Sequence, residues 1–213
     1  AVPGLGGDGG DEGPPLVYVP EVAFGPVKFC EDVDRVYSKL GRCLIAVSEG
    51  IHDADGNPMA AKLAEQQGHH VERDAHGNVQ LSGSGALGDF ISQEIKNYLG
   101  KKTRVRADTF GYMQRSMVGM ASKTDQVEAR EAGRTAARLA TSGDIDGSVA
   151  IRRVSDDPYR VEFKRIELAD VAAKTRTLPP EFLKGDNDIS DDFIKYLKPI
   201  VGEIPHVELL RSH

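Results

Sequence analysis

The sequence predicts an α/β fold built on a mostly parallel sheet, and three neighbouring segments carry this prediction. Residues 16–22, "LVYVPEV", form a short apolar run stopped by Pro20, which is typical of a buried strand. Residues 27–41 repeat apolar side chains at helical spacing and end at Gly41. Residues 43–50, "CLIAVSEG", return to the pattern of a buried strand. This order predicts a right-handed crossover between two parallel strands.

The middle of the chain continues the alternation after a polar interruption. Residues 51–83 carry a turn at "DADGNP" and a charged stretch, and we interpret them as an insertion. Apolar side chains over 86–100 line one face of a predicted helix. A strand that contains Arg104, Arg106 and Phe110 is expected to follow it.

The following segments predict a long helix and a hairpin. Residues 122–143 begin with Ser122 and Asp125 in a capping-box arrangement and continue as an Ala-rich helix. Residues 147–154 and 159–168 are separated by "SDDP" and alternate in polarity. They predict two antiparallel strands at the edge of the sheet.

The chain is predicted to hold one lobe. Residues 1–15 are rich in Gly and Pro and begin without Met, which we interpret as a linker within a longer protein. Residues 16–213 are long enough for one substantial core. Ser190 is placed to cap a C-terminal helix over 190–203, in which Pro199 is expected to introduce a kink.

The amino-acid composition argues against a nucleic-acid-binding protein and against a membrane protein. Asp and Glu total 33 against 27 for Lys and Arg, giving a formal net charge of -6 without a basic stripe. Nucleic acid is therefore not an expected partner, because phosphate-backbone affinity depends on clustered Lys and Arg. No apolar run approaches the roughly 20 residues that span a bilayer. Cys30 and Cys43 are interpreted as reduced, buried thiols, which fits the cytoplasm.

Two polar clusters fall where ligands bind in open parallel sheets, outside the carboxyl ends of strands. Residues 48–50, "SEG", end the second predicted strand, and residues 111–115, "GYMQR", end a later one. A surface ion pair or a helix cap remains the plain alternative for each charged side chain. Taken together, Glu49 offers a carboxylate to hydroxyl groups, and Arg115, with Arg106 nearby, offers guanidinium groups to a phosphate.

Two other motifs point to different chemistry. Residues 83–88, "GSGALG", satisfy the dinucleotide fingerprint, and Asp108 lies 20 residues beyond Gly88 as a ribose-binding acid would. The preceding "HGNVQL" makes a poor strand, so a glycine-rich helix entry is favoured. A metal site would need ligands from the following crowded but irregularly spaced side chains, which match no standard zinc pattern: His69, His70, Glu72, Asp74 and His76.

The order of the segments resembles the C-terminal half of the 6-phosphofructokinase family. The segments are "LVYVPEVAF", "GRCLIAVSEGI", "DAHGNVQLSGSG", "TFGYMQRSMVGMASKTDQVEAREAGRTAARLA" and "PPEFLKGDNDISDDFIKYLKPIVGE". Three features are similar to the pyrophosphate-dependent type: the D-x-x-G-x-x-Q-L loop, Tyr112, and Arg115 followed by Ser116. The resemblance implies a three-layer, Rossmann-like lobe of the phosphofructokinase fold.

The resemblance also implies site roles. Glu49 matches the carboxylate that binds hydroxyls of fructose 6-phosphate, and Tyr112 and Arg115 match the pair that binds its 6-phosphate. Arg106 matches an arginine that reaches the same sugar phosphate across a subunit interface. The catalytic T-I-D-N-D motif and the phosphate-binding glycine loop do not occur in these residues. Catalytic residues and metal ligands are therefore expected in an N-terminal half.

The function that the resemblance implies is a cytoplasmic phosphotransferase of glycolysis. It would phosphorylate fructose 6-phosphate at O1 to fructose 1,6-bisphosphate with Mg²⁺, using pyrophosphate or else ATP. Expected partners are the N-terminal half of the same enzyme and further copies in a homodimer or homotetramer, with no membrane association. A non-catalytic regulatory subunit of the same fold is the alternative.

Overall fold

The computed structural model describes residues 14–66, 85–111, 119, 121–143 and 146–202. These residues form two compact units. The first unit comprises the residues described between 14 and 111 together with Leu178–Asp191. The second comprises those described within Met117–Thr177 and from Asp192 to 202. The chain therefore passes from the first unit to the second, returns, and leaves again.

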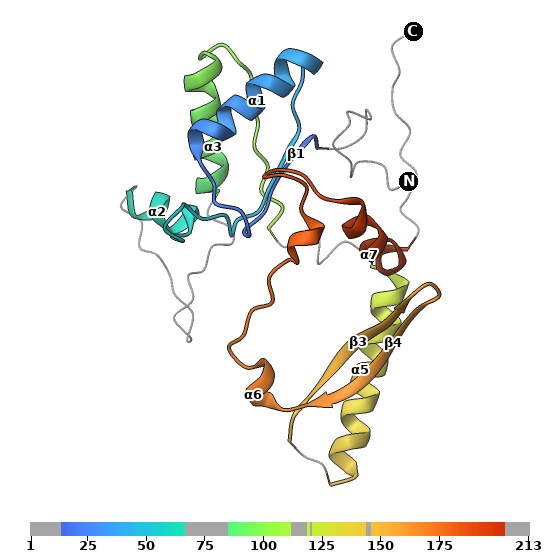
Figure 1. The fold of residues 1–213 in the computed structure, drawn as a ribbon. Helices are drawn as coiled ribbons and strands as arrows, with labels where there is room; N and C mark the ends of the chain where they lie inside the picture. Colours follow the sequence, from blue (N-terminus) through green and yellow to red (C-terminus); the bar gives the residue numbers. More distant parts are fainter. Residues whose placement is uncertain (1–13, 67–84, 112–118, 120, 144–145, 203–213) are drawn as a thin grey trace. The chain divides into compact units, whose positions relative to one another are not determined.

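The first unit confirms the predicted strand, helix and strand. β1 (Leu16–Tyr18) and β2 (Ile45–Val47) pair in parallel, with Leu16 opposite Ile45. α1 (Pro26–Leu40) connects them, as Figure 1 shows. Gly41 ends this helix at φ 68°, donating its N–H to the carbonyl of Tyr37. A left-handed residue is needed at that point, which favours glycine.

The core of the first unit lies between this sheet, α1 and the two helices that follow. Tyr18, Phe24 and Phe29 form an aromatic group with ring centroids 5.1 to 5.6 Å apart. Phe29 is 1% exposed, and burying a side chain of this size contributes about 2 to 3 kcal/mol. Around this group pack the other buried apolar side chains of the core: Leu16, Cys30, Val33, Val36, Ile51, Met59, Leu63, Leu87, Ile91 and Ile95.

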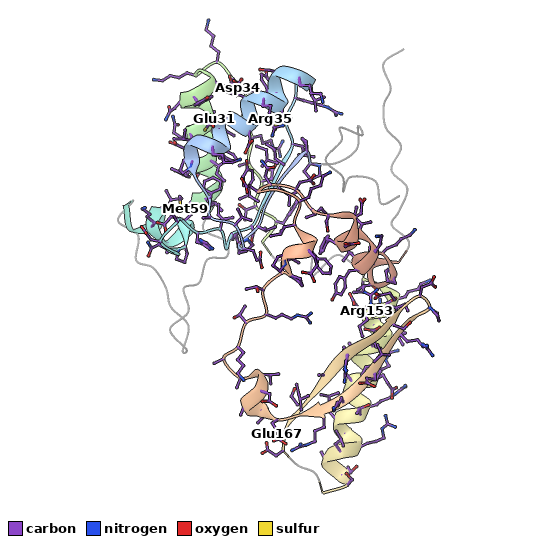
Figure 2. The ribbon with its side chains drawn as sticks, viewed as in Figure 1. Glu31, Asp34, Arg35, Met59, Arg153 and Glu167 are labelled. Carbon is purple, nitrogen blue, oxygen red and sulfur yellow. The ribbon has the colours of Figure 1, made fainter. Side chains whose placement is uncertain are left out.

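The polar insertion contains a helix that the sequence prediction missed. α2 (Met59–Gln66) packs against α3 (Ala86–Leu99), and the buried side chains at its start are those of Met59, Ala60 and Leu63. Figure 2 labels Met59 on α2. The apolar spacing is helical but covers one turn only, so the surrounding polar residues masked it. α3 was predicted correctly.

The turn at "DADGNP" was also predicted correctly, and Asp53 organises it. One carboxylate oxygen of Asp53 accepts the backbone N–H of Asp55 at 3.0 Å and that of Asn57 at 2.9 Å. The other oxygen lies 3.2 Å from Nζ of Lys62 on α2. The side chain thus closes the loop as an Asx turn does, and it fixes the entry to α2.

Acidification should loosen this turn. Hydrogen bonds from the backbone and side chain of Asn57, followed by that from Lys62, lower the pKa of Asp53 from 3.8 to about 2. A lowered pKa stabilises the folded state above pH 4, and this stabilisation is lost as the pH falls towards 2. Carboxyl ¹³C shifts recorded over this range should show Asp53 titrating near 2. A midpoint at the ordinary Asp value would contradict the role of these bonds.

The strand predicted to contain Arg104, Arg106 and Phe110 does not form. Residues 104–110 make no strand ladder in the structure. Val105 packs against the core, whereas Phe110 is 73% exposed and both arginines face solvent. One apolar side chain between two charged ones gives this segment little to bury, so the predicted strand is wrong here.

The returning segment, which contains η1 (Pro180–Phe182), is anchored to the first unit by polar contacts. The N–H of Leu178 donates to Oε1 of Glu21 at 2.8 Å. The carbonyl of Asn187 accepts the N–H of Val17 at 2.9 Å. This segment therefore borders β1, on the side away from β2 in the order of the sheet.

Asp32 on α1 ties three parts of the first unit together. It is 9% exposed, and its carboxylate accepts from Nδ2 of Asn187 at 2.8 Å and from the hydroxyl of Tyr18 at 3.3 Å. Lys28 and Arg35 donate at 3.0 and 3.1 Å. Burial raises the pKa of Asp32, but the bonds from Lys28 and Arg35 outweigh it and hold the pKa below its ordinary value. Asp32 is thus a charged acceptor satisfied from several sides.

The second unit packs one long helix against a hairpin (Figure 1). β3 (Ser148–Asp156) and β4 (Tyr159–Ile166) are antiparallel, with Ile151 opposite Phe163. The predicted hairpin is confirmed, but it forms a separate two-stranded sheet and not the edge of the β1–β2 sheet. α5 (Lys123–Thr141) covers it, and its predicted cap is confirmed: Oγ of Ser122 accepts the N–H of Asp125 at 3.2 Å.

The second unit is completed by α6 (Leu168–Val171) and α7 (Asp191–Val201). α7 falls within the predicted range 190–203 and contains Pro199. The guanidinium of Arg153, labelled in Figure 2, lies 4.8 Å from the ring centroids of both Tyr159 and Tyr196. Its Nη1 donates to the carbonyl of Tyr196 at 2.6 Å. A cation between two aromatic rings joins the hairpin to α7.

Candidate functional site

Glu49 follows β2, at the carboxyl end of the parallel pair. The ladder continues one residue past β2, since the N–H of Ser48 donates to the carbonyl of Tyr18 at 3.0 Å. The chain then turns, because Oγ of Ser48 accepts the N–H of Gly50 at 3.2 Å. This turn leaves Glu49 half-buried at the position that the sequence predicted. None of the described residues donates a hydrogen bond to its carboxylate.

Glycine at position 50 permits a close approach. A Cβ placed on Gly50 would lie 3.1 Å from Cγ of Pro20, in the loop that follows β1. That distance is tighter than ordinary van der Waals contact, so a larger residue would push the two loops apart. The S-E-G sequence therefore combines a turn-forming hydroxyl, a free carboxylate and a residue that lets the neighbouring loop pack.

A groove of about 1040 Å³ in the first unit runs past Glu49. Its floor is apolar, with side chains such as Val47 on β2 and Ile91 on α3. Charged residues at the carboxyl end of β2 and in the 104–110 segment also line this groove. The lining residues that matter for a ligand are Glu49, Arg104, Arg106, Asp108 and Gly111. The structure thus brings Glu49 and Arg106 into one cavity.

Tyr112 and Arg115, the other two predicted site residues, lie outside the described residues. Gly111, the residue before Tyr112, lines the groove. Of the two loop clusters predicted from the sequence, the described parts, residues 48–49 and Gly111, line one groove. The convergence of Arg115 on the same groove stays a prediction.

Arg106 is not isolated in the groove. Its Nε lies 2.9 Å from Oδ2 and 3.2 Å from Oδ1 of Asp108, and its Nη2 lies 3.0 Å from Oδ1. The neighbouring carboxylate raises the pKa of Arg106, which therefore remains charged. The two side chains are 76% and 61% exposed, so this pair adds little to the stability of the fold.

The "GSGALG" segment serves as a helix entry in its described part. Gly85 precedes α3 in a left-handed conformation at φ 67° and offers no side-chain cap. A Cβ on Gly88 would lie 3.0 Å from Cβ of Ala107, so this glycine lets α3 pack closely against the 104–110 segment. This packing accounts for two glycines of the motif without a dinucleotide.

Comparison with known proteins finds relatives that share one name. Over 205 residues the chain is 49% identical to the pyrophosphate–fructose 6-phosphate 1-phosphotransferase of Rhodospirillum rubrum, and the match covers 95% of the chain and 49% of that relative. The chain is thus similar to about half of a pyrophosphate-dependent phosphotransferase. A second relative of the same name, from Xanthomonas campestris, is 34% identical over 96% of the chain and 47% of its own length. No protein-family model matches the chain.

Solved structures agree with this similarity. The chain superposes on the pyrophosphate-dependent phosphofructokinase of Nitrosospira multiformis with a TM-score of 0.69 and 27% identity, and the match covers 93% of the chain and 44% of that structure. The enzyme of the same name from Marinobacter aquaeolei gives a TM-score of 0.67 at 23% identity, which supports the fold alone. The predicted α/β, phosphofructokinase-type fold is confirmed. The chain spans about half the length of the curated relatives that it matches.

Two further sequence predictions concern metals and membranes. The histidine-rich stretch with His69, His70 and His76 lies outside the described residues. In the part of the chain that the structure describes, no three His, Cys, Asp or Glu side chains gather as metal ligands would. Of the described helices, none is long and apolar enough to cross a membrane.

The sequence patterns did not reveal that Asp108 is the partner of Arg106. The sequence motifs indicated Asp108 only as a possible ribose-binding acid. A usable signal was present, because residues two apart in the predicted strand would point to the same side. An acid two residues after a candidate ligand-binding arginine is therefore placed to contact it.

Proposed function

We propose that the full protein transfers a phosphoryl group from pyrophosphate to O1 of fructose 6-phosphate, and that this chain supplies the sugar-phosphate side of the active site. The observation that carries the proposal is the shared groove of Glu49 and Arg106 at the carboxyl end of β2. The two relatives that match 95% and 96% of the chain are named for this reaction. A carboxylate and a guanidinium in one groove suit a ligand with both hydroxyl groups and a phosphate.

Each site residue then has a role. The carboxylate of Glu49 accepts hydrogen bonds from sugar hydroxyls. It is available for them because none of the described residues donates a hydrogen bond to it. Tyr112 and Arg115 follow Gly111 in the chain and bind the 6-phosphate. Arg106, which lines the same groove as Glu49, offers a further guanidinium to the same anion within this chain. The full protein is proposed to form a dimer or tetramer. Each charge-assisted bond contributes roughly 1.5 to 3 kcal/mol.

This chain would position the acceptor, and other parts of the protein would supply the donor side. Phosphoryl transfer requires in-line placement of the two substrates and neutralisation of the charge on the transferred group. By the family resemblance, Mg²⁺ is held mainly by residues of an N-terminal half of the enzyme. The protein is proposed to act in the cytoplasm.

A donor-exchange assay tests the proposal. The full-length protein, supplied with fructose 6-phosphate and Mg²⁺, should form fructose 1,6-bisphosphate with pyrophosphate and not with ATP. Formation with ATP alone would show that the assigned donor is wrong. Binding of fructose 6-phosphate without turnover by either donor would favour the non-catalytic subunit.

A further inference from the structure

We propose that Asp108 is a positioning residue for Arg106: it holds one edge of the guanidinium so that the opposite edge is presented to the anionic group of the ligand in the groove. This inference rests on the proposed function, because it assumes that Arg106 meets a sugar phosphate. It adds a residue to which neither the sequence motifs nor the family resemblance gives this role.

The geometry of the pair is side-on. Nε and Nη2 of Arg106 both face the carboxylate of Asp108, with distances of 2.9 to 3.2 Å. A guanidinium has five N–H donors in one plane, so a carboxylate on the Nε edge leaves both donors of Nη1 and one of Nη2 available. Two contacts to one edge also fix the plane of the group. A phosphate that meets the free edge then finds it already oriented.

The backbone beneath the pair is held in place. Arg106 and Asp108 are separated by Ala107, whose Cβ faces Gly88 on α3 at close range. Both residues line the groove that also contains Glu49. The contact spans only two residues, and the entropy lost in closing it is small.

The negative charge of Asp108 distinguishes a role in positioning Arg106 from direct attraction of the ligand. The charge of Asp108 opposes the approach of a phosphate, so a binding role cannot come from its charge and must come from the orientation of Arg106. Arg104 and Glu49 also line the groove and contribute one charge of each sign. A Lys at position 106 would keep the positive charge but could not bind a carboxylate on one side and a phosphate on the other with fixed geometry.

Steady-state kinetics of the full-length protein tests the inference. Asp108→Ala should raise KM for fructose 6-phosphate about 5-fold, a loss typical of an exposed charge pair, while kcat and KM for pyrophosphate change less than about 2-fold. Asp108→Glu should restore most of the affinity. Arg106→Lys should resemble Arg106→Ala. Asp170→Ala, an exposed acid in the second unit, is the matched control and should change nothing.

A double-mutant cycle gives the decisive comparison. In the Arg106→Ala background, Asp108→Ala should have no further effect on KM for fructose 6-phosphate, because the residue that it positions is absent. An unchanged or lowered KM in Asp108→Ala alone would overturn the inference, as would an effect that persists without Arg106. If the wild-type protein neither binds nor turns over fructose 6-phosphate, the proposed function fails. A wild-type protein that is active, with a silent Asp108→Ala variant, refutes only the role of Asp108.

Discussion

Arg115→Ala should weaken the binding of fructose 6-phosphate to the full-length protein by about 2 to 5 kcal/mol, as expected when one partner of a desolvated charge pair is removed. The guanidinium of Arg115 is proposed to contact the 6-phosphate, which is the charged group of the ligand. Isothermal titration with fructose 6-phosphate measures the loss directly. Fructose, which lacks the phosphate, should bind the wild type and the variant equally weakly.

Two comparison variants make the Arg115 result specific. Arg104→Ala removes an exposed arginine that lines the same groove and has no assigned role, so it should change the affinity little. Glu49→Gln keeps the shape of the side chain but removes its charge, and it should weaken the hydroxyl contacts while leaving the phosphate contact intact. If Arg115→Ala binds fructose 6-phosphate as the wild type does, the phosphate role assigned to Arg115 is wrong.

Asp32→Ala should lower the free energy of unfolding by about 2 to 3 kcal/mol, because a buried acceptor is removed while its donors remain. The hydroxyl of Tyr18 and Nδ2 of Asn187 both lose their contact with this carboxylate. Lys28 and Arg35 are 56% and 63% exposed and can turn to water, so they add less to the loss. Urea unfolding followed by circular dichroism measures the change.

Glu31→Ala is the matched control for Asp32. Glu31 is the neighbouring acid on α1, and its side chain is exposed to solvent. Figure 2 labels this side chain. Its replacement should change the free energy of unfolding by less than about 0.5 kcal/mol. Equal effects of the two substitutions would mean that the network around Asp32 does not anchor the returning segment.

The sequence was sufficient for elements whose apolar pattern is long or closed by a clear signal. α1 shows this, because helical spacing runs over its whole length and Gly41 ends it. α2 was missed because Met59, Ala60 and Leu63 cover a single turn within polar surroundings. The segment with Arg104 and Arg106 was assigned as a strand because it alternates, but alternation alone cannot show which strand would accept its hydrogen bonds.

The candidate site was predictable to a similar degree. Glu49 was found because the carboxyl end of a parallel strand is a general ligand position, and the structure places it in a groove with Arg106. The hydroxyl of Ser48 that closes the turn, and the carboxylate that binds Arg106, depend on local geometry that residue spacing does not reveal. Pairings of this kind have to be read from coordinates.

The route of the chain through the two units has a consequence for synthesis on the ribosome. Leu178–Asp191 belongs to the first unit, whereas α7 belongs mainly to the second. Neither unit is therefore encoded by one continuous stretch of the gene: the first is incomplete until translation has passed Asp191, and the second until it has passed α7. Both cores are thus unfinished during most of synthesis, which favours late maturation of the two units over growth of one unit after the other.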